Sequence, residues 1–453
     1  MFSFFRSRFF DFELIRILGS TPFGGCDVAE FLEAIDKIKK HDAESWYRAW
    51  YEQGERVEKI AQEATRDGHK APARRAYLRA CNYFRASSYM LPTSDGRSLP
   101  SAERSIRNFR KAIPLMDETI VVLDIPYEDG LTLPGYLYLP APSKRIPGQK
   151  TPILLNCGGA DSTQEELYFL YGAAGTDLGY AVLTFEGPGQ GLVLKKDQVP
   201  MRPDYEVVTS KVLDHLSSIA KANPDYFLDL ENIAVAGASM GAYYSLRAST
   251  DSRIRACVAV DPFYSLWSLA LTRMPSLYAN LWQAGWIPES FFNWSVRLSM
   301  AFDFCSRWES SLGSYMMGTS TPGQTLRRFQ AFTLDDPVNG GKVTDRAKCP
   351  ILLTGAGHAI YASPDSSTVY IYNSLKHLEK TQKEVWIPTE IGDGGLTAKV
   401  GAWGLLAQKS FQFLDKHLGV RRAGLSSYRL EVEFVMRKYK NFSILDMGEA
   451  DNY

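Results

Sequence analysis

The segment 232–247 constrains the fold of this chain more than any other stretch. A β-prone apolar run, 233–236, meets Gly237-Ala-Ser239-Met-Gly241, and a helix-forming stretch follows. This is the G-x-S-x-G pattern in the strand–turn–helix setting that presents a serine hydroxyl above the edge of a sheet. The glycines on either side have no Cβ atoms to collide where the chain bends sharply. Ser239 is therefore a candidate nucleophile, and the alternative is a serine that serves only the turn.

Composition argues against several classes of protein. The chain has 453 residues, 45% hydrophobic and 23% charged, which is typical of a globular protein of two or three structural units with a large core. Its formal net charge is +0, so nothing points to nucleic acid or an anionic membrane surface as a partner. The six cysteines form no C-x-x-C pair, which favours free thiols in a reducing, cytoplasmic location over a zinc site.

The N-terminal segment 1–10 is rich in phenylalanine, but Arg6 and Arg8 interrupt it. It therefore lacks the unbroken apolar core of a signal peptide, and no later run of about 18 apolar residues indicates a membrane span. We expect an amphipathic segment that docks on its own protein, with peripheral membrane contact as the alternative.

Hydrophobic periodicity separates a helical part of the chain from a part in which strands and helices alternate. Apolar positions recur every three or four residues in 1–115, which predicts helices. From there on, short apolar runs alternate with helical stretches, a pattern typical of a parallel sheet covered by helices on both faces. Strands are expected at 119–124, 131–139, 152–156, 181–185, 233–236, 256–260, 351–354 and 384–388, the first two as a hairpin.

The sheet-forming core is expected in two halves, 116–262 and 346–420. The interval between them is too long for one crossover between strands, and its tryptophan- and methionine-rich helical stretches predict a cap, 263–345, inserted over the active edge of the sheet. The charged tail, 421–453, is expected to add a strand and a turn with frayed ends.

A serine nucleophile on such a sheet needs an acid and a histidine base, which follow it along the chain in that order. Among the six histidines, His358 follows the strand 351–354 at the edge where open α/β sheets bind ligands. That loop ordinarily carries the acid, and the loop after the last strand, 391–401, where the base is expected, contains no histidine. Either His358 acts as base from an unusual loop, or Ser239 has no conventional base. A structural role is expected for the other five: His41, His69, His215, His377 and His417.

Two aspartates are candidates for further roles. Asp261 ends the strand 256–260 and would reach an imidazole on a neighbouring strand end, so it is the candidate acid; a helix N-cap or loop hydrogen bond is the alternative. Asp393 lies in the glycine-rich loop where a base would sit. Its carboxylate is expected either to form an Asx turn or to shuttle a proton. Nearby, Lys399 is expected to be a surface lysine rather than a local positive charge in the site.

Backbone N–H groups that would bind an oxyanion are expected at two places. The N–H of Met240 follows the serine directly and can point at developing negative charge. The loop 157–162 follows another strand at the same edge, and its adjacent glycines let the backbone approach a ligand. The second N–H is therefore assigned to Gly159 or Ala160. The irregular loop 186–191 is expected to shape the floor of the site.

Several of these features recur together in one known family. They are the helical N-terminal region and the segments 158–161, 186–191, 237–241 and 260–264. This set resembles the α/β-hydrolases that include 2,6-dihydropseudooxynicotine hydrolase and a polyketide-shortening hydrolase of melanin formation. Segments 386–389 and 392–403 look most like fungal secondary-metabolite hydrolases of the fusarin and cytochalasan type. The resemblance covers about 20–420 and implies an α/β-hydrolase fold with an N-terminal helical region and an inserted helical cap.

The family cleaves acyl or carbon–carbon bonds with a Ser, Asp, His triad, and Ser239 matches its nucleophile. Two positions depart from the family pattern: His358 lies in the acid loop, and Thr397 or a near neighbour stands where histidine is usual. The resemblance implies a small-molecule substrate, a polyketide or polyketide–amino acid hybrid, that undergoes hydrolysis or assisted closure of a pyrrolone or lactam ring. The alternatives are a non-hydrolytic cyclase that uses the fold as a template and a catalytically dead pathway scaffold.

No metal or organic cofactor is implied. We expect neither nucleic acid nor stable membrane insertion, and a homodimer is left open. A cap lined by aromatic and methionine side chains suits a large apolar substrate.

Overall fold

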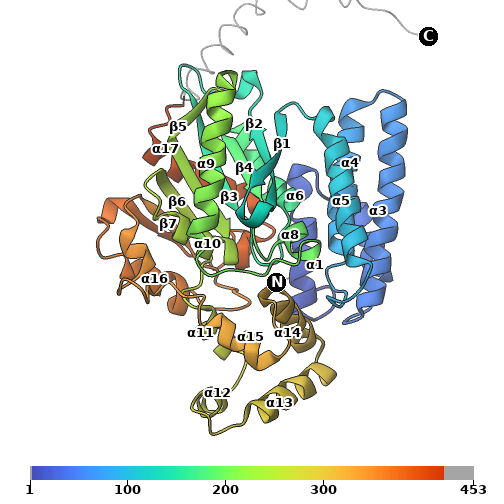
Figure 1. Cartoon of the computed structure of the whole chain (residues 1–453). Helices are drawn as coiled ribbons and strands as arrows, with labels where there is room; N and C mark the ends of the chain where they lie inside the picture. The colour runs from blue at the N-terminus through green and yellow to red at the C-terminus, as the bar shows by residue number, and fades with distance from the viewer. Residues whose placement is uncertain (1–2, 423–453) are drawn as a thin grey trace, which may run out of the picture.

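The computed structural model describes residues 3–422, which contain one mixed sheet (Figure 1). Its strands are β1 (Thr119–Pro126), β2 (Thr132–Leu139), β3 (Thr151–Cys157), β4 (Ala181–Phe185), β5 (Leu228–Ala238), β6 (Ile254–Val260), β7 (Ile351–Thr354) and β8 (Lys383–Trp386). Their spatial order is β1-β2-β4-β3-β5-β6-β7-β8. β2 is antiparallel to both neighbours, and every pair from β4 to β8 is parallel. All the expected strands are therefore present, and the first two form the expected hairpin.

Burial explains why the central strands are continuous apolar runs. Every residue of β3 and β4 is buried. Val235 of β5 lies beside Leu155 of β3 and Cys257 of β6, so apolar side chains of three strands meet in register. Such a sheet needs helices on both faces. The core helices are α6 (Gln164–Leu167), α7 (Ala173–Asp177), α8 (Gly191–Lys195), α9 (Glu206–Ala222), α10 (Met240–Ala248), α16 (Tyr370–Ser374) and α17 (Trp403–Leu418).

Two separate layers of helices meet this need. Val212 of α9 and Leu246 of α10 pack with the side chains on one face of the sheet, whereas Phe411 of α17 packs with those on the other. Figure 1 shows α9 and α10 in front of the strands and α17 behind them. The sheet is thus the middle layer of a three-layer core.

The helices of the N-terminal region lie beside the sheet (Figure 1). In α3 the apolar face buries Trp46 and Trp50 completely. The Asp42 side chain accepts a hydrogen bond from the N–H of Glu44, which satisfies a donor that the helix itself leaves free. The region comprises α1 (Arg8–Leu18), α2 (Val28–Lys37), α3 (Ala43–Arg66), α4 (Lys70–Ser87) and α5 (Ser98–Ala112).

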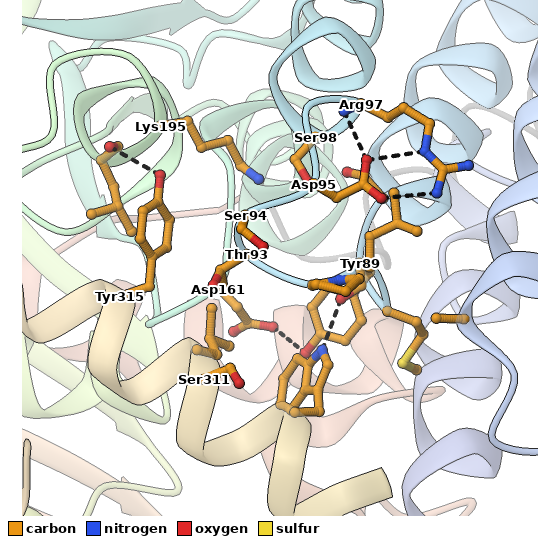
Figure 2. Close-up of a pocket in the computed structure, with 18 of the residues that line it drawn as sticks. Tyr89, Thr93, Ser94, Asp95, Arg97, Ser98, Asp161, Lys195, Ser311 and Tyr315 are labelled. Carbon is orange, nitrogen blue, oxygen red and sulfur yellow. Dashed lines mark hydrogen bonds and ion pairs between the residues drawn. The ribbon is translucent and has the colours of Figure 1, made fainter. Parts of the chain in front are cut away.

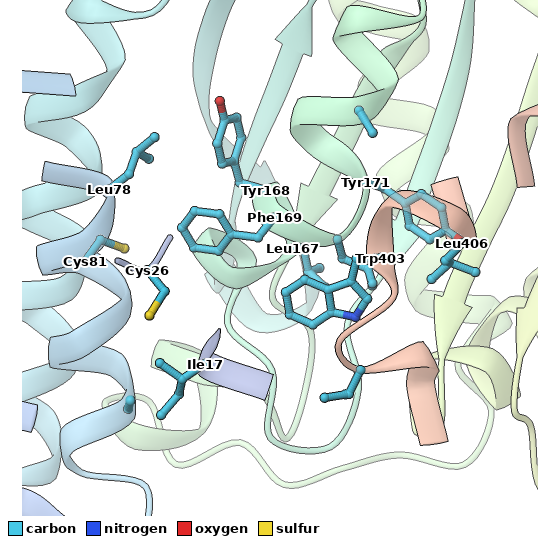
Figure 3. Close-up of a cluster of buried hydrophobic side chains, with 14 of the residues drawn as sticks. Ile17, Cys26, Leu78, Cys81, Leu167, Tyr168, Phe169, Tyr171, Trp403 and Leu406 are labelled. Carbon is cyan, nitrogen blue, oxygen red and sulfur yellow. The ribbon is translucent and has the colours of Figure 1, made fainter. Parts of the chain in front are cut away.

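A buried apolar cluster joins this region to the sheet (Figure 3). Side chains of α1 and α4 approach the chain around α6, and α17 closes the cluster from the other side. Because the cluster is continuous, the N-terminal helices and the sheet share a core. Its labelled members are Ile17, Cys26, Leu78, Cys81, Leu167, Tyr168, Phe169, Tyr171, Trp403 and Leu406.

The cap lies between β6 and β7 and covers the end of the sheet opposite the C-terminus of the described chain (Figure 1). Within the cap, Met316 and Met317 of α14 are buried, but Trp286 and Trp294 are 80% and 56% exposed. These two tryptophans of the tryptophan- and methionine-rich stretch therefore do not face the core. The helices of the cap are α11 (Leu266–Leu271), α12 (Ser276–Gln283), α13 (Glu289–Phe302), α14 (Phe304–Met317) and α15 (Pro322–Phe329).

Two expectations concern the ends of the chain. The strand and turn expected in 421–453 fall outside the described residues from position 423 onward. In the described part of the segment 1–10, α1 begins at Arg8 and the rings of Phe9 and Phe10 are buried, so this part docks on its own protein as predicted. Within 3–422 no helix has the length and apolar character that crossing a membrane requires.

Phe10 gives a test of this docking, because its ring contacts Trp46 of α3 and Phe304 of α14 at centroid distances of 5.2 and 5.5 Å. Phe10→Ala should lower the free energy of unfolding by about 3–5 kcal/mol, since it opens a cavity among fully buried rings. Phe302→Ala is the control, as that ring is 86% exposed. Denaturant unfolding checks both, and equal midpoints for the two variants would contradict the docking.

Candidate active site

The turn between β5 and α10 presents Ser239. The serine has φ 56° and ψ −116°, a sparsely populated conformation that L-residues hold only when the surrounding structure enforces it. Its N–H donates to the carbonyl of Val260 at 2.9 Å, which ties the turn to β6. A Cβ at Gly237 would collide with the Gly241 carbonyl, and one at Gly241 with the Cys157 carbonyl. Both glycines are therefore required by close backbone approach.

Ser239 opens into a cavity of about 340 Å³ between the sheet and the cap. The cap contributes mostly apolar side chains, among them Leu266, Met274, Met316, Met317 and Phe329. The N-terminal region contributes Phe12, Glu13 and Arg16 of α1. An apolar chamber with a few polar groups on one side is the usual form of a small-molecule site.

The backbone donors that the sequence assigned to an oxyanion surround the serine. Met240, Gly159 and Ala160 line the same cavity as Ser239. Met240 is the first residue of α10, and the first N–H groups of a helix have no partner within that helix. These three residues are thus placed where they can meet a substrate oxygen.

Gln190 holds the loop that carries Gly159. Its amide donates to the carbonyls of Gly158 and Gly159 at 2.7 and 3.0 Å. Its own oxygen accepts from the N–H of Gly187 and from the hydroxyl of Tyr205, both at 2.8 Å. Gln190 thus ties the backbone at Gly158 and Gly159 to the loop 186–191.

The role of Gln190 was not predicted. The sequence indicated only that the loop 186–191 would shape the floor of the site, and a single glutamine between glycines carries no further signal. The Gln190 side chain is 1% exposed, which shows that it belongs to the interior rather than the surface.

Asp261 lies at the end of β6 and has φ 53°. Its carboxylate accepts hydrogen bonds from the Thr354 hydroxyl, the Ala398 N–H and the Lys399 ammonium, each at 2.7 Å. Lys399 also donates to the Gly355 carbonyl at 2.6 Å. The candidate acid is therefore occupied by a lysine instead of an imidazole.

Lys399 is fully buried, so the expectation of a surface lysine is wrong. Burial lowers the pKa of its ammonium, and the charge of Asp261 opposes that shift. Ala398 and Lys399 both have positive φ, which lets this loop bring the lysine under the sheet edge. Sequence reasoning missed this arrangement because the two charges stand 138 positions apart.

The structure does not bring His358 or Asp393 together with Ser239. Both residues are exposed, and neither lines the serine's cavity. No histidine of the described chain lines it; Thr397 and Ala398 occupy the wall next to Asp261 instead. The N–H of His358 donates to the Gly395 carbonyl at 2.8 Å, which pairs the two loops along their backbones.

A larger cavity of about 1120 Å³ lies beside the first, between the loop after α4 and helix α14 (Figure 2). Figure 2 shows Lys195 pointing into it, and Asp161 joined to Tyr89 at its inner end. Burial lowers the pKa of the Lys195 ammonium. The two cavities share a wall made of Tyr89, Ala160, Asp161, Ser162, Trp308 and Leu312.

Charged side chains of the site do not form a metal centre. Among residues 3–422 no three His, Cys, Asp or Glu side chains are grouped so that they could hold a metal ion.

Comparison with known proteins gives one family match and several close relatives. The family described as esterase FrsA-like matches residues 30–284. The chain is 54% identical over 426 residues to the α/β-hydrolase gkaG of Penicillium citrinum, which spans 94% of this chain and 99% of gkaG. It is 52% identical over 427 residues to the α/β-hydrolase xenA of Xenoacremonium sinensis, with 94% and 100% covered. It is also 49% identical over 433 residues to the α/β-hydrolase psoB of Aspergillus fumigatus, with 94% and 97% covered.

Among solved structures, 2,6-dihydroxy-pseudo-oxynicotine hydrolase is similar, with a TM-score of 0.66. The alignment covers 88% of this chain and 95% of that chain, at 19% identity. At this level of identity the likeness concerns the fold alone.

Gln190→Leu should lower turnover about 10- to 100-fold with little change in KM, because the loop 157–162, called here the oxyanion loop, loses its support while its N–H groups remain. Steady-state kinetics check it. Gln53→Leu is the matched control, since Gln53 is also a buried amide that donates to a backbone carbonyl, that of Glu30, far from the cavity. Similar losses in both variants would show that stability rather than loop position is affected.

Lys399→Met should lower the free energy of unfolding by about 3 kcal/mol, because Asp261 is left buried without its cation. Adding Asp261→Asn should recover part of the loss, since the unpaired charge is then removed. Lys416→Met is the control, as Lys416 pairs with Glu384 on the surface. Chemical denaturation measures all three, and an unchanged midpoint for Lys399→Met would refute the pairing.

Proposed function

The chain belongs to the esterase FrsA-like family of α/β-hydrolases, and on that premise we propose that it acts on a polyketide or polyketide–amino acid hybrid of fungal secondary metabolism. The proposed reaction is activation of a substrate carbonyl for ring closure to a pyrrolone or lactam. The resemblance to fungal secondary-metabolite hydrolases and the apolar cavity under the cap support this substrate class.

One observation carries the choice of reaction. Ser239 and the oxyanion donors open into a cavity whose described wall contains no imidazole. Serine hydrolysis needs a base that takes the hydroxyl proton, and the candidate acid Asp261 is paired with Lys399 instead. The site therefore retains the means to polarise a carbonyl without the usual means to make serine a nucleophile. We assign Ser239 the role of a polar anchor that donates to the carbonyl oxygen.

The ring closure needs no cofactor. In an N-(3-oxoacyl) α-aminoaldehyde, the carbon between the two carbonyls loses a proton and attacks the aldehyde carbon, whose oxygen gains a proton. Loss of water then leaves a five-membered lactam ring with a carbon–carbon double bond. A cavity that holds both reacting carbons together supplies the orientation on which such a closure depends.

Hydrolysis through Ser239 is the second candidate. The strained backbone of the elbow favours it, since this conformation is the one that exposes a nucleophile. In that route His358 would have to serve as base from its exposed loop, with Asp261 as acid. A pathway scaffold without activity is the third candidate, and turnover by the purified chain would exclude it.

Ser239→Ala separates the first two candidates. If Ser239 is an anchor, kcat/KM for closure of an N-(3-oxoacyl) α-aminoaldehyde should fall only about tenfold, the effect of one lost hydrogen bond. If Ser239 is a nucleophile, activity should fall by about 10⁴-fold or more. Product analysis by mass spectrometry distinguishes loss of water from addition of water.

A fluorophosphonate probe gives an independent check, because an unactivated serine should remain unlabelled. Ser245→Ala is the matched control: its hydroxyl lies on α10, which begins directly after Ser239, and donates to the Gly241 carbonyl. Stoichiometric labelling of the wild type that is lost in Ser239→Ala would contradict the anchor role.

A further inference from the structure

Two carboxylates meet in the wall of the Ser239 cavity. Glu13 of α1 and Asp161 of the oxyanion loop both line it, as does Tyr89. The Tyr89 hydroxyl lies 3.2 Å from Glu13 Oε1 and 2.6 Å from Asp161 Oδ2, where it bridges them. Figure 2 shows the bond between Tyr89 and Asp161. Two acids joined by one hydroxyl form a path along which a proton can move.

The arginines near Glu13 make their shortest ion pairs with other carboxylates. Arg16 binds both oxygens of Glu166, at 2.6 and 2.5 Å, and Asp161 Oδ2 at 2.5 Å. Its contact with Glu13 is the longest of the set, at 3.4 Å. Arg85 of α4 also pairs with Glu166, at 3.3 Å. Three carboxylates thus face two guanidinium groups, and Glu13 is the acid with the weakest pairing.

Every element around Glu13 contributes to its titration. Burial raises the pKa of Glu13 to about 7, with Arg16 and Arg85 opposing the shift and Asp161 and Glu166 adding to it. Burial also acts on Asp161, but Arg16 and the Tyr89 hydroxyl hold its pKa below the ordinary value. The pKa values of Glu13 and Asp161 are therefore shifted in opposite directions. Such a difference separates a group that can transfer a proton from one that stays charged.

The hydroxyl groups around Glu13 do not compete for this role near neutral pH. Burial raises the pKa of Tyr89 and also that of Tyr361, which lines the cavity from the loop after β7. On the cap side, Glu309 is paired with Arg273 at 2.8 Å. Glu13 is the group in this wall that can change charge near neutrality without first breaking a short ion pair.

We infer that Glu13 is the catalytic acid–base of the Ser239 cavity and takes the place of the imidazole that the cavity wall lacks. Its carboxylate accepts the proton from the carbon between the two carbonyls, and the released electron pair forms the bond to the aldehyde carbon. The protonated acid returns that proton to the aldehyde oxygen. In the second stage the carboxylate accepts the remaining proton of the same carbon, the carbon–oxygen bond breaks, and the departing hydroxide leaves with this proton as water. Asp161 and Tyr89 are positioning residues. The inference rests on the proposed ring closure.

The matched control is Glu30 of α2. It is 7% exposed and accepts from Tyr83 at 2.8 Å and Arg79 at 2.9 Å, so it reproduces the tyrosine and arginine pairing of Glu13 away from the cavity. Glu13→Gln and Glu30→Gln each replace one buried carboxyl group with an amide of similar size. Thermal unfolding of both variants shows whether either has lost its fold.

The experiment measures proton abstraction separately from closure. A 3-oxoacyl amide without an aldehyde is incubated in D₂O, and enzyme-dependent exchange at the central carbon is followed by NMR from pH 5 to 9. A base must be ionised, so exchange by the wild type and by Glu30→Gln should rise with pH and level off above about 7. Glu13→Gln should exchange about 10²- to 10⁴-fold more slowly and lose this inflection. The carboxyl infrared band that titrates near neutrality should also be missing from Glu13→Gln.

The possible outcomes distinguish a failure of this inference from a failure of the proposed function. Exchange by folded Glu13→Gln at the wild-type rate, or with the same inflection, would overturn the inference, as would a wild type that shows no enzyme-dependent exchange. Exchange that depends on Glu13 without closure of the aldehyde substrate would support the inference and contradict the proposed function. If Glu13→Gln does not fold, Glu13→Asp takes its place, with a displaced inflection expected and an unchanged profile contrary to the inference.

Discussion

The backbone turn at Ser239 is the constraint on which the rest of the site depends. Residues held in such a conformation cost on the order of 1–3 kcal/mol, so neighbouring structure must stabilise the turn. The bond from Ser239 to Val260 and the absence of side chains at Gly237 and Gly241 provide that support. Since the same close packing brings the oxyanion loop against the start of α10, the elbow and the donors form one rigid unit. The position of the Ser239 hydroxyl in the cavity is therefore fixed by the packing of this unit.

The Asp261–Lys399 pair occupies the end of β6, where the sequence predicted that Asp261 would face an imidazole. A carboxylate at the end of β6 that is left buried without a partner would be strongly destabilising. Lys399 provides the partner from the loop where the base is usual, and Thr397 and Ala398 close the cavity wall. The Asp261 carboxylate is thereby paired with a cation inside the fold and not with an imidazole.

The N-terminal region forms part of the cavity wall through helix α1. Helix α1 is fastened to the core by buried aromatic rings and by the ion pairs of Arg16, and it reaches the cavity wall with Phe12 and Glu13. The cap supplies apolar surface from the opposite side. The cavity is thus lined by three parts of the chain, namely helix α1, the cap and the elbow of the sheet. The wall shared with the outer cavity contains Tyr89 and Asp161, whereas Glu13 and Arg16 line the inner cavity alone.

The resemblance to fungal α/β-hydrolases is confirmed, and the strands and the elbow lie where the sequence placed them. These features depend on local patterns, namely apolar periodicity and glycines at a sharp turn, which any reader of the sequence can see. The burial of Lys399 and the cluster around Glu13 gave no such signal, because their partners are far away along the chain. Sequence alone determined the sheet, the turn and the family. Only the tertiary structure decided which charges meet and which are sealed from water, since burial and long-range pairing are properties of the packed chain.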